Sequence, residues 1–274
     1  YIAEGACRER GAQLRCVEAA ALPEAIKEGV DVLMLTHVDY RTGAMHDMAA
    51  VTARAHAVGA LVIWDLAHSA GAVPVDLSAA NADFAIGCGY KYLNGGPGAP
   101  AFVWAHPRHV NRALQPLSGW WGHARPFAFT PGYQPAEGIL RYQCGSQPIL
   151  SLIALDQGVD TVLAAGPLGG MRALRAKSLA LTDLFIDRVQ RLQGDHGLGI
   201  ATPLAHDARG SQVSLTRDTG AYEIVQALIA RGVIGDFRAG DGKRSPDILR
   251  FGFTPLYLGF ADVWHAAEHL REVL

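Results

Sequence analysis

Charged residues and cysteines are both scarce in this sequence. Only 18% of the 274 residues are charged, and the formal net charge is −2 with a pI near 6.6. A chain without an excess of positive charge cannot neutralise the phosphates of a nucleic acid, so we expect no nucleic-acid partner. The four cysteines form no Cys-x-x-Cys pair and no metal-site spacing, which predicts reduced thiols in a cytoplasmic protein.

Long hydrophobic runs are also lacking. We find no apolar stretch close to the roughly 20 residues that span a bilayer, since the run from Ala60 to Trp64 has only the length of a strand. The sequence therefore predicts no membrane partner. It begins at Tyr1 with neither a methionine nor a signal region, so we expect a further segment upstream.

Glycine and apolar residues, by contrast, are abundant. The 31 glycines and 50% hydrophobic residues favour an α/β enzyme with a sizeable core. Short apolar runs predict buried strands over residues 13–17, 32–36, 61–64, 84–86 and 102–104. Between the second and third runs, apolar residues at helical spacing predict a helix that begins after Asp47 and ends at Gly59. This strand–helix–strand order predicts a crossover unit, whose ligand sites lie beyond the carboxyl ends of the strands.

The second half of the chain has a different pattern. Residues 107–148 are rich in glycine, proline and aromatic residues, and this long irregular stretch predicts a functional loop. We expect helices at 149–158, about 171–192, 222–231 and from 261 onward, strands at 212–215 and 248–251, and an apolar segment at 233–237. The predicted domains are a large one over residues 1–165 and a small α+β one over residues 166–274.

A carboxylate and a lysine mark the predicted chemistry. Asp65 ends the strand LVIWD, His68 follows three residues later, and Lys91 lies in GCGYKYLNGGPG after the next strand. Taken singly, Asp65 could cap a turn and Lys91 could extend from the edge of the core into water. Together they have the composition of a pyridoxal phosphate site, in which a lysine amine forms a Schiff base and an acid pairs with the pyridinium nitrogen.

The residues around Lys91 support this interpretation. Tyr90 offers a phenol for the cofactor phosphate or for proton transfer. Glycines at positions 95, 96 and 98 would allow the backbone to approach a cofactor closely. The combination of these signals, rather than any one of them, favours a cofactor site at Lys91.

Four motifs carry a resemblance to a known family. DLAHSAGAVPVDL, GYKYLNGGPG, LSGWWGH and LRFGFTPLY occur in this order and closely resemble kynureninase, specifically its bacterial form. The resemblance implies an α/β protein of pyridoxal phosphate fold-type I, with a three-layer large domain, a mixed, mostly parallel sheet and a small C-terminal α+β domain. It also implies a homodimer that hydrolyses the Cβ–Cγ bond of L-kynurenine, or of its 3-hydroxy form, in tryptophan catabolism and NAD biosynthesis.

The resemblance further implies roles for the residues around the lysine. Lys91 resembles the lysine that carries pyridoxal phosphate as a Schiff base, and Asp65 resembles its pyridinium partner. His68 would lie near the cofactor. Tyr90 resembles a phosphate-contacting tyrosine and is, with Lys91, a candidate catalytic residue.

Three further residues match the family's motifs. The indole of Trp120 would contact the phosphate, and Ser146 would lie near cofactor and substrate, where relatives have threonine or asparagine. Arg250 would bind the substrate α-carboxylate, a task suited to its bidentate fork. Without the resemblance, Trp120 would be read as a packing aromatic and Arg250 as an ion-pair partner.

Other interpretations stay open at this point. A cysteine desulfurase or another class V aminotransferase-like enzyme would share the aspartate and the lysine, and Cys144 would then be the candidate nucleophile, although no basic residue flanks it. An incomplete, non-catalytic module is a further alternative, because the family's phosphate-binding turn and ring-stacking aromatic precede the position of Tyr1. The H-x-x-E-H pattern at residues 265–269 predicts the solvated face of a helix rather than a metal site.

Overall fold

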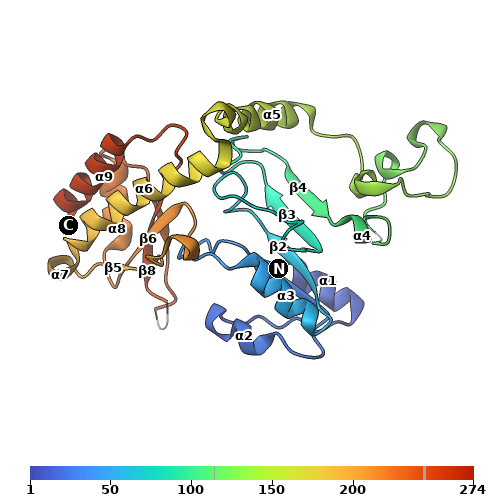
Figure 1. Cartoon of the computed structure of the whole chain (residues 1–274), viewed down its shortest axis with the longest axis horizontal. Coiled ribbons are helices and arrows are strands. Elements are labelled where there is room, and N and C mark those ends of the chain that lie inside the picture. Colours follow the sequence, from blue (N-terminus) through green and yellow to red (C-terminus); the bar gives the residue numbers. More distant parts are fainter. Residues whose placement is uncertain (114, 243–244) are drawn as a thin grey trace.

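The computed structural model describes residues 1–113, 115–242 and 245–274, without the side chains of residues 195 and 196. Its strands form two separate four-stranded sheets within these residues. Figure 1 shows the first sheet near the centre and the second toward the C-terminal end of the chain. Each sheet has a hydrophobic core of its own.

The first sheet is mixed and mostly parallel, as predicted. Its order is β1 (Val32–Thr36), β2 (Leu61–Asp65), β3 (Phe84–Cys88) and β4 (Ala101–Ala105), with only β4 antiparallel to its neighbour. Helix α3 (Met48–Ala57) makes the crossover from β1 to β2. Asp47 caps it by accepting a hydrogen bond from the Ala50 N–H at 2.9 Å, which confirms the predicted start of this helix.

One face of this sheet is covered and the other is open. Val62 and Trp64 are buried on the side of α2 (Leu22–Ala25) and α3, and the Trp64 Nε1–H donates to Thr52 Oγ1 at 3.0 Å. Because side chains alternate along a strand, Leu61, Ile63 and Asp65 lie on the opposite face. Several apolar side chains on that face are exposed, namely Val32, Met34, Leu61 and Val103. The third layer therefore stays a prediction for the complete protein.

The second sheet is antiparallel throughout. Its order is β5 (Gly199–Ile200), β6 (Gln212–Arg217), β8 (Asp247–Gly252) and β7 (Asp236–Arg238). Helices α6 (Gly170–Gln190), α8 (Ala221–Ile229) and α9 (Phe260–Val273) pack with it around a core that includes Phe185, Leu215 and Leu249. The helices and strands predicted for this half are confirmed, while the domain boundary at residue 165 stays a prediction.

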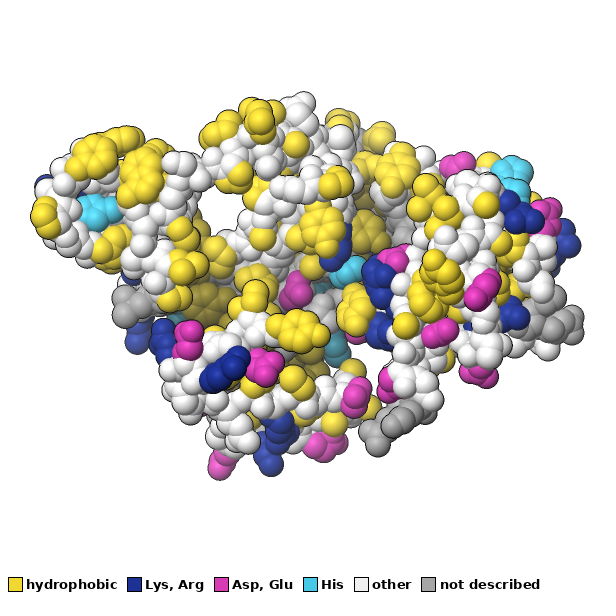
Figure 2. All heavy atoms as spheres, turned by 180° about the vertical axis from the view of Figure 1, so that it is seen from behind, with side chains coloured by type: hydrophobic (Ala, Val, Ile, Leu, Met, Phe, Trp, Pro, Cys, Tyr) yellow, Lys and Arg dark blue, Asp and Glu magenta, His cyan; other side chains and the backbone are white. Residues whose placement is uncertain are grey.

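An irregular arm connects the two halves. After α4 (Pro107–Val110), residues 115–148 form the arm, which contains the short 3-10 helices η2 (Trp120–Gly122), η3 (Pro126–Ala128) and η4 (Gly138–Tyr142). Figure 1 shows the arm projecting beyond α4, on the side of the first sheet away from the second sheet. Helix α5 (Ile149–Leu163) and η5 (Gly166–Leu168) then lead back to α6. In Figure 2 apolar side chains gather on the arm and along α5.

Two expectations from the sequence are wrong. Residues 13–17 form no strand; they are exposed and follow helix α1 (Ile2–Arg10), and no described strand lies beside them to take up their backbone hydrogen bonds. The second error concerns residues 149–168, which have a mean hydropathy of 1.4 and are long and apolar enough, by length and composition alone, to cross a membrane. Asp156 and Asp160 interrupt this run, so the segment contains no unbroken apolar stretch of that length.

Candidate functional site

Asp65 and His68 lie at the carboxyl edge of the first sheet. In the strand register Asp65 is flanked by Thr36 of β1 and Ile86 of β3. Its Oδ1 accepts a hydrogen bond from the Ala67 N–H at 2.8 Å, so the local turn-capping role is real. This hydrogen bond uses one carboxylate oxygen. The side chain lies at the carboxyl end of its strand, where ligands bind in folds of this kind.

Lys91 lies in a tightly closed loop after β3. The Asn94 N–H donates to the Lys91 carbonyl, and the Gly95 N–H donates to the Gly89 carbonyl, both at 2.9 Å. A Cβ atom on Gly95 would lie 2.8 Å from Ala99 Cβ and 2.9 Å from the Gly89 oxygen. The loop itself therefore requires glycine at position 95, independently of any approach to a cofactor.

The Lys91 amine faces an open cavity. Its Nζ lies 5.1 Å from the centroid of the Tyr90 ring, and among the described residues it forms no ion pair with a carboxylate. The cavity has a volume of about 450 Å³, within the usual range for small-molecule sites. Besides these two residues, its lining includes His68, Tyr92, Gln212, Asp236, Arg238, Arg250 and Tyr257.

Arg250 reaches this cavity from the second sheet. Its Nη1 donates to the Tyr40 carbonyl at 2.7 Å, and its Nη2 forms an ion pair with Asp236. The other oxygen of Asp236 contacts Arg238 Nη1 at 2.5 Å. The cavity therefore lies between the carboxyl edge of the first sheet and strands β6, β7 and β8 of the second.

Positive charge prevails in the cavity. Burial, together with the nearby positive charges of Lys91 and Arg250, lowers the pKa of His68 to about 4. Burial also raises the pKa of Tyr92 to about 12, and its hydroxyl donates to the Ser211 carbonyl at 3.0 Å. At neutral pH His68 is thus uncharged and Tyr92 protonated, so the lysine and the arginines set the charge and favour an anionic ligand.

Trp120 and Ser146 are not brought to this cavity. Both lie on the arm, where the Trp120 ring packs against Trp121 at 4.6 Å and Phe127 at 5.8 Å between centroids, and Trp120 is 42% exposed. Neither residue belongs to the cavity lining. One chain therefore unites His68, Tyr90, Lys91 and Arg250, with Asp65 at the adjoining strand end, and holds the two arm residues apart.

Sequence reasoning missed Asp236 and Arg238. We had described residues 233–237 only as an apolar segment, whereas β7 spans Asp236–Arg238. Two polar residues separated by one position in a strand point to the same face, and this period of two was the available signal. This pattern could not indicate that Asp236 and Arg238 line the same cavity as Lys91, because that depends on how the two sheets are placed.

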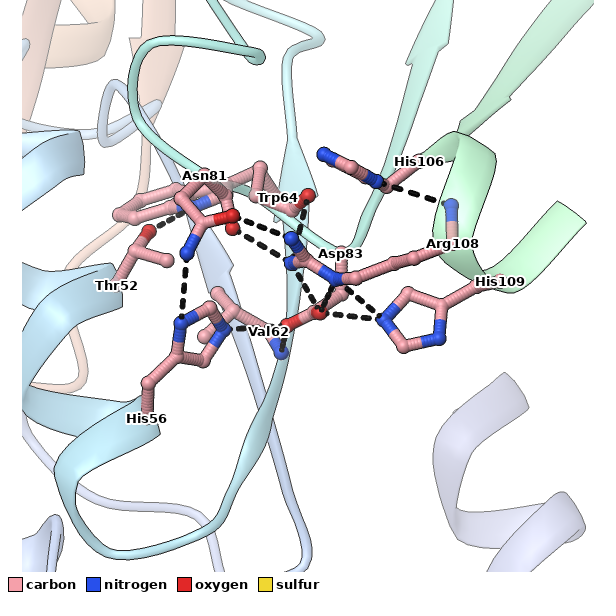
Figure 3. A network of polar contacts seen from close by, with 10 residues as sticks. Thr52, His56, Val62, Trp64, Asn81, Asp83, His106, Arg108 and His109 are labelled. Atoms are coloured by element: carbon pink, nitrogen blue, oxygen red, sulfur yellow. Dashed lines mark hydrogen bonds and ion pairs between the residues drawn. The ribbon is translucent and has the colours of Figure 1, made fainter.

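A second polar cluster lies at the opposite edge of the first sheet. Asp83 immediately precedes β3, and its carboxylate accepts a hydrogen bond from the Val62 N–H at the start of β2 at 2.8 Å. It also contacts His56 Nε2 at 2.8 Å, Arg108 Nη2 at 2.6 Å and His109 Nε2 at 2.7 Å (Figure 3). Both oxygens of this carboxylate are hydrogen-bonded. Asp83 therefore joins β2, β3, α3 and α4 in a structural junction.

The helical H-x-x-E-H pattern has the predicted arrangement. Val263, Ala267 and Leu270 of α9 are buried, while Glu268 pairs with Arg188 and Arg271 on the other side of the helix. Within the described ranges, no group of three or more histidine, cysteine or acidic residues is placed to hold a metal ion. The cavity instead fits pyridoxal phosphate in kind, because it offers a lysine amine that no described carboxylate pairs with and cationic donors for an anion, while the Asp65 carboxylate lies at the end of the neighbouring strand.

Comparisons with known proteins agree with these features. Residues 174–270 match the family model described as the kynureninase C-terminal domain. The chain is 54% identical over 277 aligned positions to the kynureninase of Pseudomonas fluorescens and 53% identical to that of Burkholderia mallei. In both cases the match covers 100% of this chain and 64% of the relative, so the chain spans somewhat less than two thirds of their length.

Solved structures establish the fold. The apo cysteine desulfurase of Thermococcus onnurineus superposes with a TM-score of 0.79 at 18% identity, covering 97% of this chain and 67% of that chain. A C-DES variant, whose structure holds glycine linked covalently to a pyridoxal phosphate cofactor, has a TM-score of 0.77 at 19% identity over 94% of this chain and 65% of its own. The predicted α/β fold of pyridoxal phosphate fold-type I is confirmed.

Proposed function

We propose that the chain belongs to the kynureninase family, which it matches along its whole length, and that the complete protein hydrolyses the Cβ–Cγ bond of L-kynurenine to anthranilate and L-alanine. The observation that carries the proposal is the Lys91 amine, which forms no ion pair with any described carboxylate and shares a cavity with Arg250. The proposed cofactor is pyridoxal phosphate, which supplies an electron sink when it is bound. The 3-hydroxy form of kynurenine is a second substrate on the same grounds.

Lys91 and Asp65 have complementary tasks in this proposal. Lys91 Nζ would hold the cofactor covalently, and the same nitrogen would serve as the base that takes the proton from the substrate Cα. The Asp65 carboxylate, at the end of β2, would pair with the cofactor ring nitrogen and favour its protonated form. His68, uncharged at neutral pH, lies beside them as a hydrogen-bonding group without charge.

Tyr90 and Arg250 orient the bound molecules. The Tyr90 hydroxyl would donate to the cofactor phosphate or move a proton on the substrate. The planar fork of Arg250 receives the α-carboxylate and so fixes the Cα–H bond relative to Lys91. A change at Arg250 should therefore weaken substrate binding more than cofactor retention.

Trp120 and Ser146 require a second subunit in this proposal. Their distance from the cavity of their own chain, and the exposed apolar residues of α5 and the arm, favour a homodimer in which each arm completes the partner's site. This arrangement accounts for the apolar character of α5 without a membrane. The proposed enzyme is accordingly a cytoplasmic homodimer with a small-molecule substrate and no nucleic-acid partner.

Cysteine desulfurase activity is less well supported. The desulfurase likeness is below 25% identity and concerns the fold. Cys144 lies on the arm, outside the cavity lining, and its Sγ contacts Gln115 Nε2 at 3.2 Å rather than a basic group. No described residue beside Cys144 is placed to activate a thiolate for attack on a substrate sulfur.

The decisive experiment is an absorbance spectrum of the complete protein with pyridoxal phosphate, before and after L-kynurenine is added. We expect a visible band and then fluorescent anthranilate from wild type, and neither from Lys91→Ala. Lys27→Ala, which removes an exposed lysine, is the matched control and should behave as wild type. A band without anthranilate would refute the substrate, and a band that persists in Lys91→Ala would refute the role of the lysine.

A further inference from the structure

The guanidinium of Arg250 is already occupied in the ligand-free cavity. One of its nitrogens binds the Tyr40 carbonyl and another binds Asp236, and the Arg250 side chain is only 14% exposed. A guanidinium that is this far removed from water needs a partner. Asp236 supplies that partner in the form of a carboxylate, the same chemical group that the proposed function places on Arg250.

Asp236 has an alternative partner within reach. Its second oxygen contacts Arg238, and the side chains of Asp236 and Arg238 are 40% and 37% exposed. An aspartate with this much exposure can change its hydrogen bonds without leaving a buried charge unpaired. Asp236 could therefore release Arg250 and keep its ion pair with Arg238.

The charges facing the cavity favour this exchange only for certain ligands. If Asp236 leaves Arg250, the buried guanidinium must receive another negative charge. A ligand carboxylate provides it, whereas an amide, an ester or an amine does not and would leave the guanidinium unpaired. The energetic difference between these ligand classes thus arises at the Asp236–Arg250 contact.

We propose that Asp236 is a specificity-determining residue whose carboxylate holds the place of the ligand carboxylate on Arg250, and that a ligand carrying a free carboxylate displaces it onto Arg238. This inference rests on the proposed role of Arg250 as the carboxylate anchor. The new element is that the Asp236 carboxylate excludes amino-acid amides and esters from the cavity. If Asp236 only oriented Arg250, neutralising Asp236 should instead weaken the binding of a ligand carboxylate.

The test measures binding rather than turnover. The probe is 4-oxo-4-phenylbutanoate, which has an aryl ketone and a carboxylate but no amine, together with its amide, and calorimetry follows both on the complete protein. Wild type should bind the acid and not detectably the amide. In Asp236→Asn the acid should bind at least about fivefold more tightly and the amide should become measurable, because the internal competitor is gone.

Weaker or unchanged binding of the acid by Asp236→Asn would overturn the proposal. The matched control is Asp218→Asn, which neutralises an exposed carboxylate just beyond β6 and should leave both affinities as in wild type. Arg250→Gln tests the premise separately, since it should abolish binding of the acid. Unchanged binding in that variant would refute the anchor role of Arg250, whatever Asp236 does.

A second measurement uses wild-type protein alone and does not depend on how a variant folds. A crystal structure with 4-oxo-4-phenylbutanoate should have the probe carboxylate on Arg250 and Asp236 bound to Arg238 only. The proposal fails if Asp236 keeps its contact with Arg250 while the probe is bound.

Discussion

At the scale of single residues, Asp83 and Asp236 each contact more than one cationic or basic side chain. They differ in how deeply the carboxylate is buried, and we expect them to differ in role for that reason. The Asp83 side chain is 2% exposed and accepts hydrogen bonds from three side chains and one backbone N–H. The Asp236 side chain is 40% exposed and can exchange partners. A buried, fully bonded carboxylate stabilises one structure, while an exposed one with two partners can take part in ligand exchange.

Replacing Asp83 tests the buried case. Asp83→Asn should lower the free energy of unfolding by about 3–5 kcal/mol, since Arg108, His56 and His109 lose a buried charged acceptor. Urea titration of both proteins gives the difference. Asp218→Asn, an exposed carboxylate, should change stability by less than about 0.5 kcal/mol, and an equally small effect at Asp83 would contradict its role as a junction.

The stability difference between wild type and Asp83→Asn should depend on pH. The hydrogen bonds from Arg108 and His56 hold the pKa of Asp83 well below the ordinary value of 3.8, although burial opposes them. A carboxylate whose pKa is depressed on folding contributes its stability above the unfolded value and loses it as pH falls toward the folded value. The stability difference between wild type and Asp83→Asn should therefore be full near neutrality and shrink below about pH 3.8.

At the scale of elements, helix α5 supports the loop that carries Lys91. Asn94 has a positive φ of 60°, and its Nδ2 donates to Thr161 Oγ1 of α5 at 2.9 Å. A Cβ atom on Gly158 of α5 would lie 2.5 Å from the Asn94 carbonyl carbon and 2.6 Å from the Leu93 oxygen. The helix thus touches the lysine loop backbone directly, and glycine at 158 is what allows this approach.

Gly158→Ala should consequently destabilise the protein, although alanine is the better helix former. Overpacking against the loop should cost about 1–3 kcal/mol in urea unfolding and weaken pyridoxal phosphate binding, because the loop must shift. Gly5→Ala in α1, where a Cβ would meet no atom within 4 Å, is the matched control and should stabilise by about 0.5–1 kcal/mol. An equal increase in the free energy of unfolding in both variants would show that α5 does not determine the conformation of the Lys91 loop.

At the scale of the whole molecule, the arm and α5 expose several large apolar side chains close together in sequence. Among the arm residues Phe127 is 67% and Phe129 80% exposed, and in α5 Ile149 is 60% and Leu150 84% exposed. Contiguous apolar surface of this kind marks an interaction site. In the proposed dimer these residues meet the second chain and carry Trp120 and Ser146 to its cavity.

Complementation tests this exchange of arms. Lys91→Ala and Trp120→Ala should each be strongly impaired as homodimers of the complete protein. In a random one-to-one mixture of subunits, half of the dimers are mixed, and each mixed dimer has one site with both Lys91 and Trp120. Anthranilate formation should then recover to about one quarter of the wild-type rate per site. No recovery would mean that Trp120 serves the cavity of its own chain.

The sequence by itself determined the elements and the site residues that stay close to their own strands. Asp65 and Lys91 could be proposed as site residues because a buried strand that ends in a carboxylate, or runs into a glycine-rich loop, carries its chemistry within a few residues. The helix caps followed from local hydrogen bonds for the same reason, as at Asp47.

Only the tertiary structure decided which distant residues share the cavity. Arg250 belongs to it and Trp120 does not, although the motifs around both are equally distinct in sequence. The pairing of Asp236 with Arg250, the junction at Asp83 and the exposure of residues 13–17 also depend on the placement of one element against another. Local preferences act within a few residues, whereas such contacts depend on packing between segments far apart in the chain.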